Sequence, residues 1–185
     1  MPFLSFAQEV TQVKATKKLR IKNIYPKLAT VKLHINQKNE TIMNDVITKE
    51  ALFNHPIDKV WNAISKAEEI STWFIKADFK AEKGYKYTFT SEPNEKGCTT
   101  ISGEVKEANP YTLVYTWIVA DTKVETTVKW KLETTPNGTK LLLEHSGISN
   151  YQGETAIKMF ESFNGGWNNC IKELLAYLKT EIHAG

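Results

Sequence analysis

The chain has 185 residues, of which 41% are hydrophobic and 24% are charged, a composition that excludes a wholly disordered protein. It contains no run of about 18 apolar residues, which excludes a transmembrane helix. The opening residues lack the basic and apolar regions of a secretory signal, so we expect a cytoplasmic protein. The two cysteines, Cys98 and Cys170, are expected to be free, buried thiols, with a single disulfide as the alternative.

The charge is unevenly distributed between two parts of the chain. Residues 1–42 hold 8 Lys and Arg against 2 Asp and Glu, whereas residues 43–185 hold 16 Lys against 19 Asp and Glu. Arg20, in the basic part, is the only arginine of the chain. Because surfaces that read nucleic acid rely on the bidentate contacts of arginine, the acidic remainder is not expected to bind nucleic acid.

The basic part shows neither helical nor alternating periodicity, and Pro26 interrupts it. We interpret residues 1–42 as a flexible or loosely docked extension that the domain does not need for folding. Two alternatives stay open: a basic arm that touches membrane or nucleic acid, and an over-long gene start with Met43 as the true initiator. Residues 43–185 are then the folded domain.

Sequence patterns typical of strands and helices begin after Met43. Residues 44–53 are rich in β-branched side chains and predict a strand. Residues 54–64 predict a short helix, with Pro56 at its first position and apolar side chains recurring every three or four residues. A second short helix is predicted over residues 65–74.

A series of short segments bounded by turn signals follows, and most of them alternate between apolar and polar residues. These predicted strands are residues 79–81, 85–90, 99–108, 112–119, 124–133 and 139–147. The last segment, residues 153–182, has one apolar stripe at helical spacing. An antiparallel meander of alternating strands has one face to bury, and only this helix is long enough to cover it. The sequence therefore predicts an α+β fold in which a curved sheet grips the C-terminal helix.

Six motifs occur in the order expected for a known superfamily. They are HPIDKVWNAIS, ISTWF, GEVKEANPYTLVYTW, TTVKWKLE, GTKLLLEHSG and GGWNNCIKELLAYL. With them, residues 46–180 resemble the SRPBCC/START-like superfamily, and most of all the family of the C-terminal domain of the activator of the ninety-kilodalton heat-shock protein's ATPase. The resemblance implies a helix-grip fold: a seven-stranded antiparallel sheet, two short helices after its first strand, and an apolar cavity between the sheet and the long C-terminal helix.

Two glycines, Gly165 and Gly166, stand beside Trp167 in the interior of the predicted long helix. Each costs about 0.8–1 kcal/mol relative to alanine, so the missing side chains should serve a purpose. The resemblance places them where the helix passes the sheet. We expect either close packing of the helix on the sheet or the mouth of a cavity.

The candidate binding residues share the inward phase of their strands or of the long helix. They are Tyr87, Phe89, Tyr115, Trp117, Trp130, His145, Phe163 and Trp167. Such an aromatic stripe is typical of a plain core, but buried tyrosine and tryptophan also suit an apolar pocket with a few polar groups.

His145 is the weak candidate for a catalytic residue, and the alternative is a hydrogen-bonded core histidine. Its neighbour Glu144 points to the other face of the strand and cannot be its partner. If His145 faces the cavity, Tyr115 is a candidate partner. The histidines are scattered and no Cys-x-x-Cys pair occurs, so no metal site is predicted. No phosphate-binding glycine loop or nucleophile motif is present, so no cofactor is predicted.

Three functions fit these observations. The leading hypothesis is a module that binds a small hydrophobic or aromatic molecule in the cavity, without membrane insertion. The second is a cyclase- or hydrolase-like enzyme that uses the same cavity, which rests on the resemblance alone. The third is a cofactor that activates a heat-shock ATPase through a protein contact.

Overall fold

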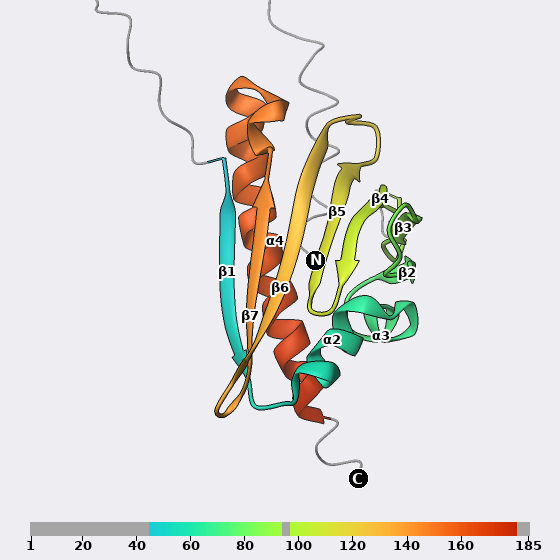
Figure 1. Ribbon diagram of the computed structural model, residues 1–185. Coiled ribbons are helices and arrows are strands. Elements are labelled where there is room, and N and C mark those ends of the chain that lie inside the picture. Colours follow the sequence, from blue (N-terminus) through green and yellow to red (C-terminus); the bar gives the residue numbers. More distant parts are fainter. Residues whose placement is uncertain (1–44, 94–96, 181–185) are drawn as a thin grey trace, which may run out of the picture.

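The computed structural model describes residues 45–93 and 97–180 (Figure 1). In chain order, their elements are β1 Ile47–Phe53, α2 Ile57–Ser65, α3 Ala67–Trp73, β2 Lys76–Asp78, β3 Lys86–Thr90, β4 Thr100–Asn109, β5 Thr112–Val119, β6 Glu125–Thr135, β7 Gly138–Ser146, the 3-10 helix η3 Ile148–Tyr151, and α4 Gly153–Thr180. The basic extension expected over residues 1–42 lies outside these described residues.

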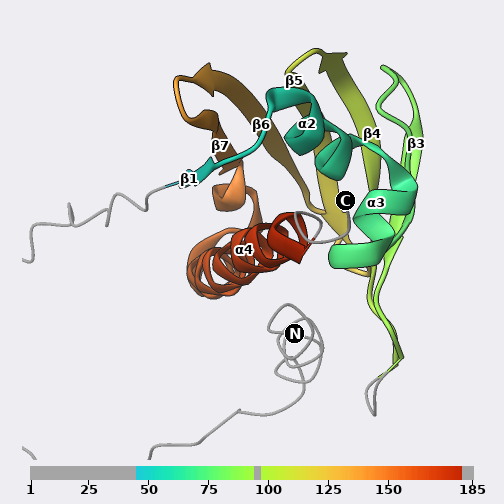
Figure 2. The ribbon, with the colours of Figure 1, turned by 90° about the horizontal axis from the view of Figure 1, so that it is seen from below.

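The strands form one antiparallel sheet in the order β1-β7-β6-β5-β4-β3-β2. Consecutive strands from β2 to β7 pair with one another, and the first strand, β1, pairs with the last, β7. Figure 2 shows the sheet curving around α4, with α2 and α3 over the remaining part of its concave side. The predicted helix-grip fold, with seven strands and two short helices after the first, is confirmed.

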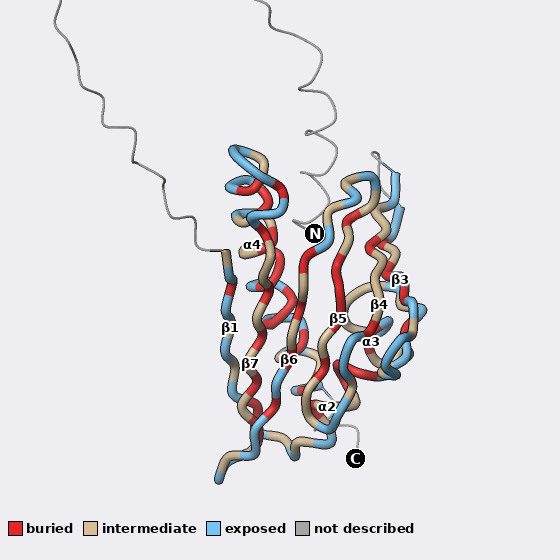
Figure 3. The backbone as a smooth tube through the Cα atoms, turned by 45° about the horizontal axis from the view of Figure 1, so that its top comes forward, coloured by how far each residue is buried: buried red, intermediate tan, exposed pale blue. Residues whose placement is uncertain are grey.

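Burial follows the alternation of the sequence along the strands. In β7 every second residue is buried, and β6 has the same period over most of its length (Figure 3). The buried side chains of α4 recur at the three- and four-residue spacing of an apolar stripe. They are Ala156, Met159, Phe163, Gly166, Trp167, Cys170, Ile171, Leu174 and Leu178. The sheet and α4 therefore bury a common core, and the site residues lie in it.

The structure corrects two local predictions. The second strand is Lys76–Asp78 and not residues 79–81, because Phe79 packs into the core while Lys80 forms an isolated bridge with Lys66. Pro56 precedes the first helix instead of occupying its first position, and its carbonyl oxygen accepts from the amide of Lys59.

The edge strand β1 is fixed at its start and along its inner face. The Asp45 carboxylate accepts hydrogen bonds from the backbone amides of Gly147 (3.2 Å) and Ser149 (2.6 Å). Burial opposes ionisation of Asp45, but the hydrogen bonds from Ser149, Gly147 and Ile148 together outweigh it and lower the pKa of the carboxyl group. Lys49 faces α4 and donates to Oδ1 of Asn164 at 2.6 Å, and its partial burial lowers its pKa. An inward-facing lysine on an edge strand also hinders pairing with other chains.

Candidate functional site

All eight candidate residues are buried and lie on one side of the sheet or on the helix that covers it. The rings of Trp117 and Trp167 lie 5.2 Å apart between their centroids, which joins β5 to α4. The ring of Phe89 on β3 lies 6.2 Å from that of Trp117 on β5, although β4 separates the two strands. The structure therefore brings the predicted residues together in one aromatic cluster, with ring spacings typical of packed aromatic pairs.

His145 is fully buried in this cluster and both of its ring nitrogens have partners. Nε2 lies 2.8 Å from Oγ1 of Thr126, and Nδ1 accepts from the indole nitrogen of Trp167 at 2.9 Å. The Thr126 hydroxyl donates to the backbone oxygen of Trp117 at 3.0 Å, so it is left to accept from His145. This assigns the neutral ring with its proton on Nε2.

Burial lowers the pKa of His145 from 6.5 to about 3, against a smaller opposing effect of the Asp45 carboxylate. The ring is thus neutral at physiological pH. The prediction that Tyr115 is the partner of His145 is wrong, because the Tyr115 hydroxyl instead accepts from the indole nitrogen of Trp130 at 2.8 Å. Thr126 is the partner that the sequence analysis missed, although it shares the inward phase of Trp130 on β6.

The hydroxyls of the two candidate tyrosines, Tyr87 and Tyr115, also form hydrogen bonds in the core. Tyr87 donates its hydroxyl to the backbone oxygen of Thr116 at 2.7 Å. Burial raises the pKa of Tyr87 and of Tyr115 far above the ordinary value of 10, so both stay neutral.

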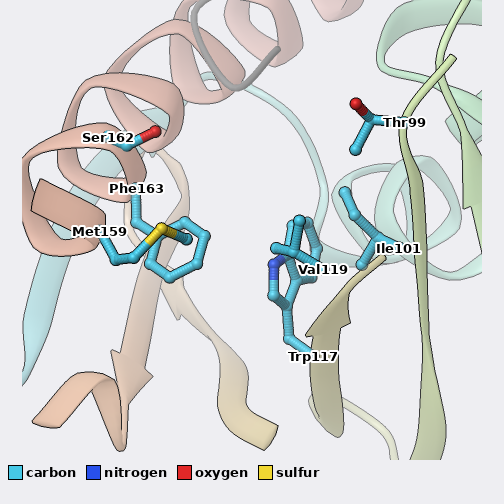
Figure 4. A pocket seen from close by; sticks show the side chains of 7 residues that line it. All are labelled: Thr99, Ile101, Trp117, Val119, Met159, Ser162 and Phe163. Carbon is cyan, nitrogen blue, oxygen red and sulfur yellow. The ribbon is translucent and has the colours of Figure 1, made fainter. Parts of the chain in front are cut away.

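A first hollow of about 10 Å³ lies between the N-terminal half of α4 and the ends of β4 and β5. Its volume is that of a single water molecule. Figure 4 shows α4 side chains on one side facing strand side chains on the other. The lining residues are Thr99, Ile101, Trp117, Val119, Met159, Ser162 and Phe163. The polar groups among the lining side chains are the hydroxyls of Thr99 and Ser162 and the indole nitrogen of Trp117, and the rest of the lining is apolar.

A second hollow, also of about 10 Å³, lies beneath α3. Its lining is Ile64, Ile70, Trp73, Phe74, Phe79, Phe89, Tyr115 and Trp130. Phe74 and Phe79 were not among the candidates. Phe74 ends a predicted helix, and Phe79 begins a predicted strand of three residues, which is too short to show a period. Phe74 is half-buried at the end of α3, and its ring reaches Trp167 at 6.5 Å and Phe89 at 6.2 Å.

The two helix glycines have different surroundings. A Cβ atom added to Gly165 would meet no heavy atom within 4 Å, so the expectation of close packing is wrong at this position. Gly166 is buried in the face of α4 that covers the sheet. Neither glycine lines the hollows.

Other features of residues 45–93 and 97–180 bear on the classes of function considered above. No group of three His, Cys, Asp or Glu side chains lies close enough to hold a metal ion in this part of the chain. No helix within the same residues is long and apolar enough to cross a membrane. Both cysteines are free thiols, but Cys98 is exposed and not buried as expected, whereas Cys170 is buried.

Comparisons with known proteins agree with the architecture. The family model described as activator of Hsp90 ATPase homolog 1-like protein matches residues 54–179. Among solved structures, MLL2253 from Mesorhizobium loti is 26% identical, with a TM-score of 0.64 over 73% of this chain and 97% of that one. BH1534 from Bacillus halodurans is 30% identical, with a TM-score of 0.57 over 72% of this chain and 96% of that one.

DynU16, from the dynemicin biosynthetic locus, is 20% identical and shares the fold, with a TM-score of 0.63 over 75% of this chain and 48% of that one. A search of curated proteins finds no match. The family model covers most of the chain and confirms the resemblance seen in the sequence motifs. The protein therefore belongs to the family of proteins similar to activator of Hsp90 ATPase homolog 1.

Proposed function

We propose that this protein binds a small hydrophobic or aromatic molecule between the sheet and α4. The observation that carries the proposal is the first hollow, where mostly apolar side chains of α4 and β5 face each other. Its few polar groups are the hydroxyls of Thr99 and Ser162 and the indole nitrogen of Trp117. An apolar site with a few polar groups is the usual form of a small-molecule site. A charged ligand would find no partner of opposite charge there.

The hollow has to widen before it can hold an organic molecule, because its volume is only about 10 Å³. Met159 is suited to this movement, since an unbranched thioether side chain changes conformation readily. A ligand that buries about 300 Å² of apolar surface gains roughly 7 kcal/mol. Association costs of at least about 4 kcal/mol leave roughly 3 kcal/mol, which corresponds to an affinity in the millimolar range.

The hydrogen bonds of His145 favour binding over acid–base catalysis at this position. Both ring nitrogens are occupied by Thr126 and Trp167, and the side chain is fully buried. A general acid or base has to reach the substrate within hydrogen-bond distance. His145 would have to give up one of its two partners to do so.

Titration with the uncharged fluorophore N-phenyl-1-naphthylamine tests the proposal. Ser162 faces the hollow, whereas the adjacent Glu161 is exposed on another side of the helix. Ser162→Phe should weaken probe binding at least about tenfold, because the larger side chain fills the first hollow. Glu161→Phe should bind the probe like the wild type. Equal affinity in the two variants would place the probe elsewhere and refute the site.

A further inference from the structure

The short helix α3 is joined to α4 by two side-chain contacts. The hydroxyl of Tyr177 donates to Oε2 of Glu69 at 2.7 Å, and the ring of Phe74 stacks on Trp167 with an interplanar angle of 27°. Trp167 and Tyr177 are ten residues apart, so the two contacts are spaced about 15 Å along α4. Figure 2 shows the C-terminal end of α4 beside α3.

Phe74 lies where a ligand would have to enter the second hollow from the side of α3. Its ring lies between Trp167 of α4 and Phe89 of β3, and it forms part of the wall of the second hollow. Being half-buried, the ring is reached by solvent on one side while it covers aromatic core residues on the other. A ligand that approaches Tyr115 and Trp130 from the side of α3 therefore requires the Phe74 ring to move away from Trp167.

The helix that carries Phe74 is weakly held by its own backbone. It spans seven residues, Ala67–Trp73, and a helix this short is not stable without tertiary contacts. Lys66 interrupts the path from α2 with an extended conformation, φ −99° and ψ 130°. On its other side, α3 is held by the buried Ile70 and by the indole nitrogen of Trp73, which donates to the backbone oxygen of Ala63 in α2 at 2.8 Å. The bond between Tyr177 and Glu69 adds a hydrogen bond that joins α3 to α4.

We propose that α3 is a flap over the second hollow, through which a ligand reaches the core between the sheet and α4. Phe74 is its gate, and the bond between Tyr177 and Glu69 is its latch. The proposal rests on the proposed function, because a gate is needed only if a ligand enters. Loss of the latch leaves the core in place and lets α3 and Phe74 move away from α4 more often. Ligand association becomes faster, and the bound state keeps its aromatic contacts.

Tyr177→Phe removes the latch, and Tyr111→Phe is its matched control. The Tyr111 hydroxyl donates to Oδ1 of Asp58, also at 2.7 Å, so both changes delete a tyrosine–carboxylate bond. Amide hydrogen exchange at Ile70 and Phe74, which donate to backbone carbonyls within this segment, should be about fivefold faster in Tyr177→Phe. The control should exchange like the wild type there. Unchanged exchange in Tyr177→Phe would overturn the flap.

Stopped-flow mixing with N-phenyl-1-naphthylamine measures the gate separately. Tyr177→Phe and Phe74→Ala should both raise the association rate constant several-fold, while Tyr111→Phe should leave it unchanged. An equal association rate in all four proteins would overturn the gate. A probe that binds none of them would refute the proposed function and the gate together, and the hydrogen-exchange result distinguishes that outcome from failure of the flap.

Discussion

The indole nitrogen of Trp167 donates to Nδ1 of His145 at 2.9 Å, a bond that joins the long helix to β7 in the centre of the core. The bond exists only while Nδ1 carries no proton. Protonation of the ring would set two N–H groups against each other in surroundings without water, where an unsatisfied buried donor costs about 1–3 kcal/mol. The stability of the fold is thus tied to the neutral state of His145.

Acid should destabilise the protein below pH 6.5. The pKa of His145 is near 6.5 in the unfolded chain and about 3 in the folded one, so the unfolded state binds one more proton between these values. The contribution of His145 is complete above pH 6.5 and is lost as the pH falls, by at most about 1.4 kcal/mol per pH unit. Urea unfolding between pH 4 and 8 measures the loss.

The matched variant for this prediction is His145→Gln. A glutamine amide can still donate to Thr126 and accept from Trp167, but it does not titrate. The variant should therefore lose less stability than the wild type between pH 6.5 and 4. Identical pH dependence in the two proteins would show that other groups cause the loss.

Gly165→Ala should stabilise the protein by up to about 1 kcal/mol. The new methyl group would meet nothing within 4 Å, and alanine restricts the unfolded chain. Gly103→Ala is the contrasting variant, because its Cβ would collide with the backbone oxygen of Thr116 and lie 2.9 Å from Cε1 of Tyr87. It should destabilise strongly. A melting temperature lowered by Gly165→Ala would indicate that this open position is not a simple helix interior.

Tyr115→Phe should cost about 1–3 kcal/mol, because it leaves the indole nitrogen of Trp130 without its acceptor in the core. Tyr85→Phe deletes a hydroxyl that donates to Asp78 at 2.5 Å in an exposed setting, where water can replace it. That variant should change the free energy of unfolding much less than Tyr115→Phe does. Equal losses by urea unfolding would mean that burial does not control the cost of these bonds.

A thiol reagent such as Ellman's should modify one cysteine per native chain and two after denaturation. Cys98 is exposed, whereas Cys170 is buried and burial raises its pKa, which suppresses the reactive thiolate. Because Cys98 immediately precedes Thr99 of the first hollow, a fluorophore on it could report ligand binding. Modification of Cys170 in the native protein at the rate of Cys98 would contradict the packing of α4.

Alternation and helical spacing were sufficient to predict the fold and the inward phase of the eight candidates. Trp117 and Trp130 lie on strands whose period of two fixes the face of each side chain. The same reasoning did not find Phe74, which ends a predicted helix, or Phe79, which begins a predicted strand too short to show a period. It also could not decide between a filled and an open cavity, because that depends on side-chain volumes and conformations and not on which face a residue occupies.

The pairing of β1 with β7 has a consequence for how the chain is made. Ile47 lies opposite His145, so this edge of the sheet pairs two strands that are roughly 100 residues apart in the chain. Contacts between such distant segments form slowly during folding. On a ribosome, β1 emerges long before its neighbour exists. The inward face of β1 therefore waits uncovered until β7 and then α4 have been synthesised, and during that interval the charge of Lys49 is well placed to discourage association with other nascent chains.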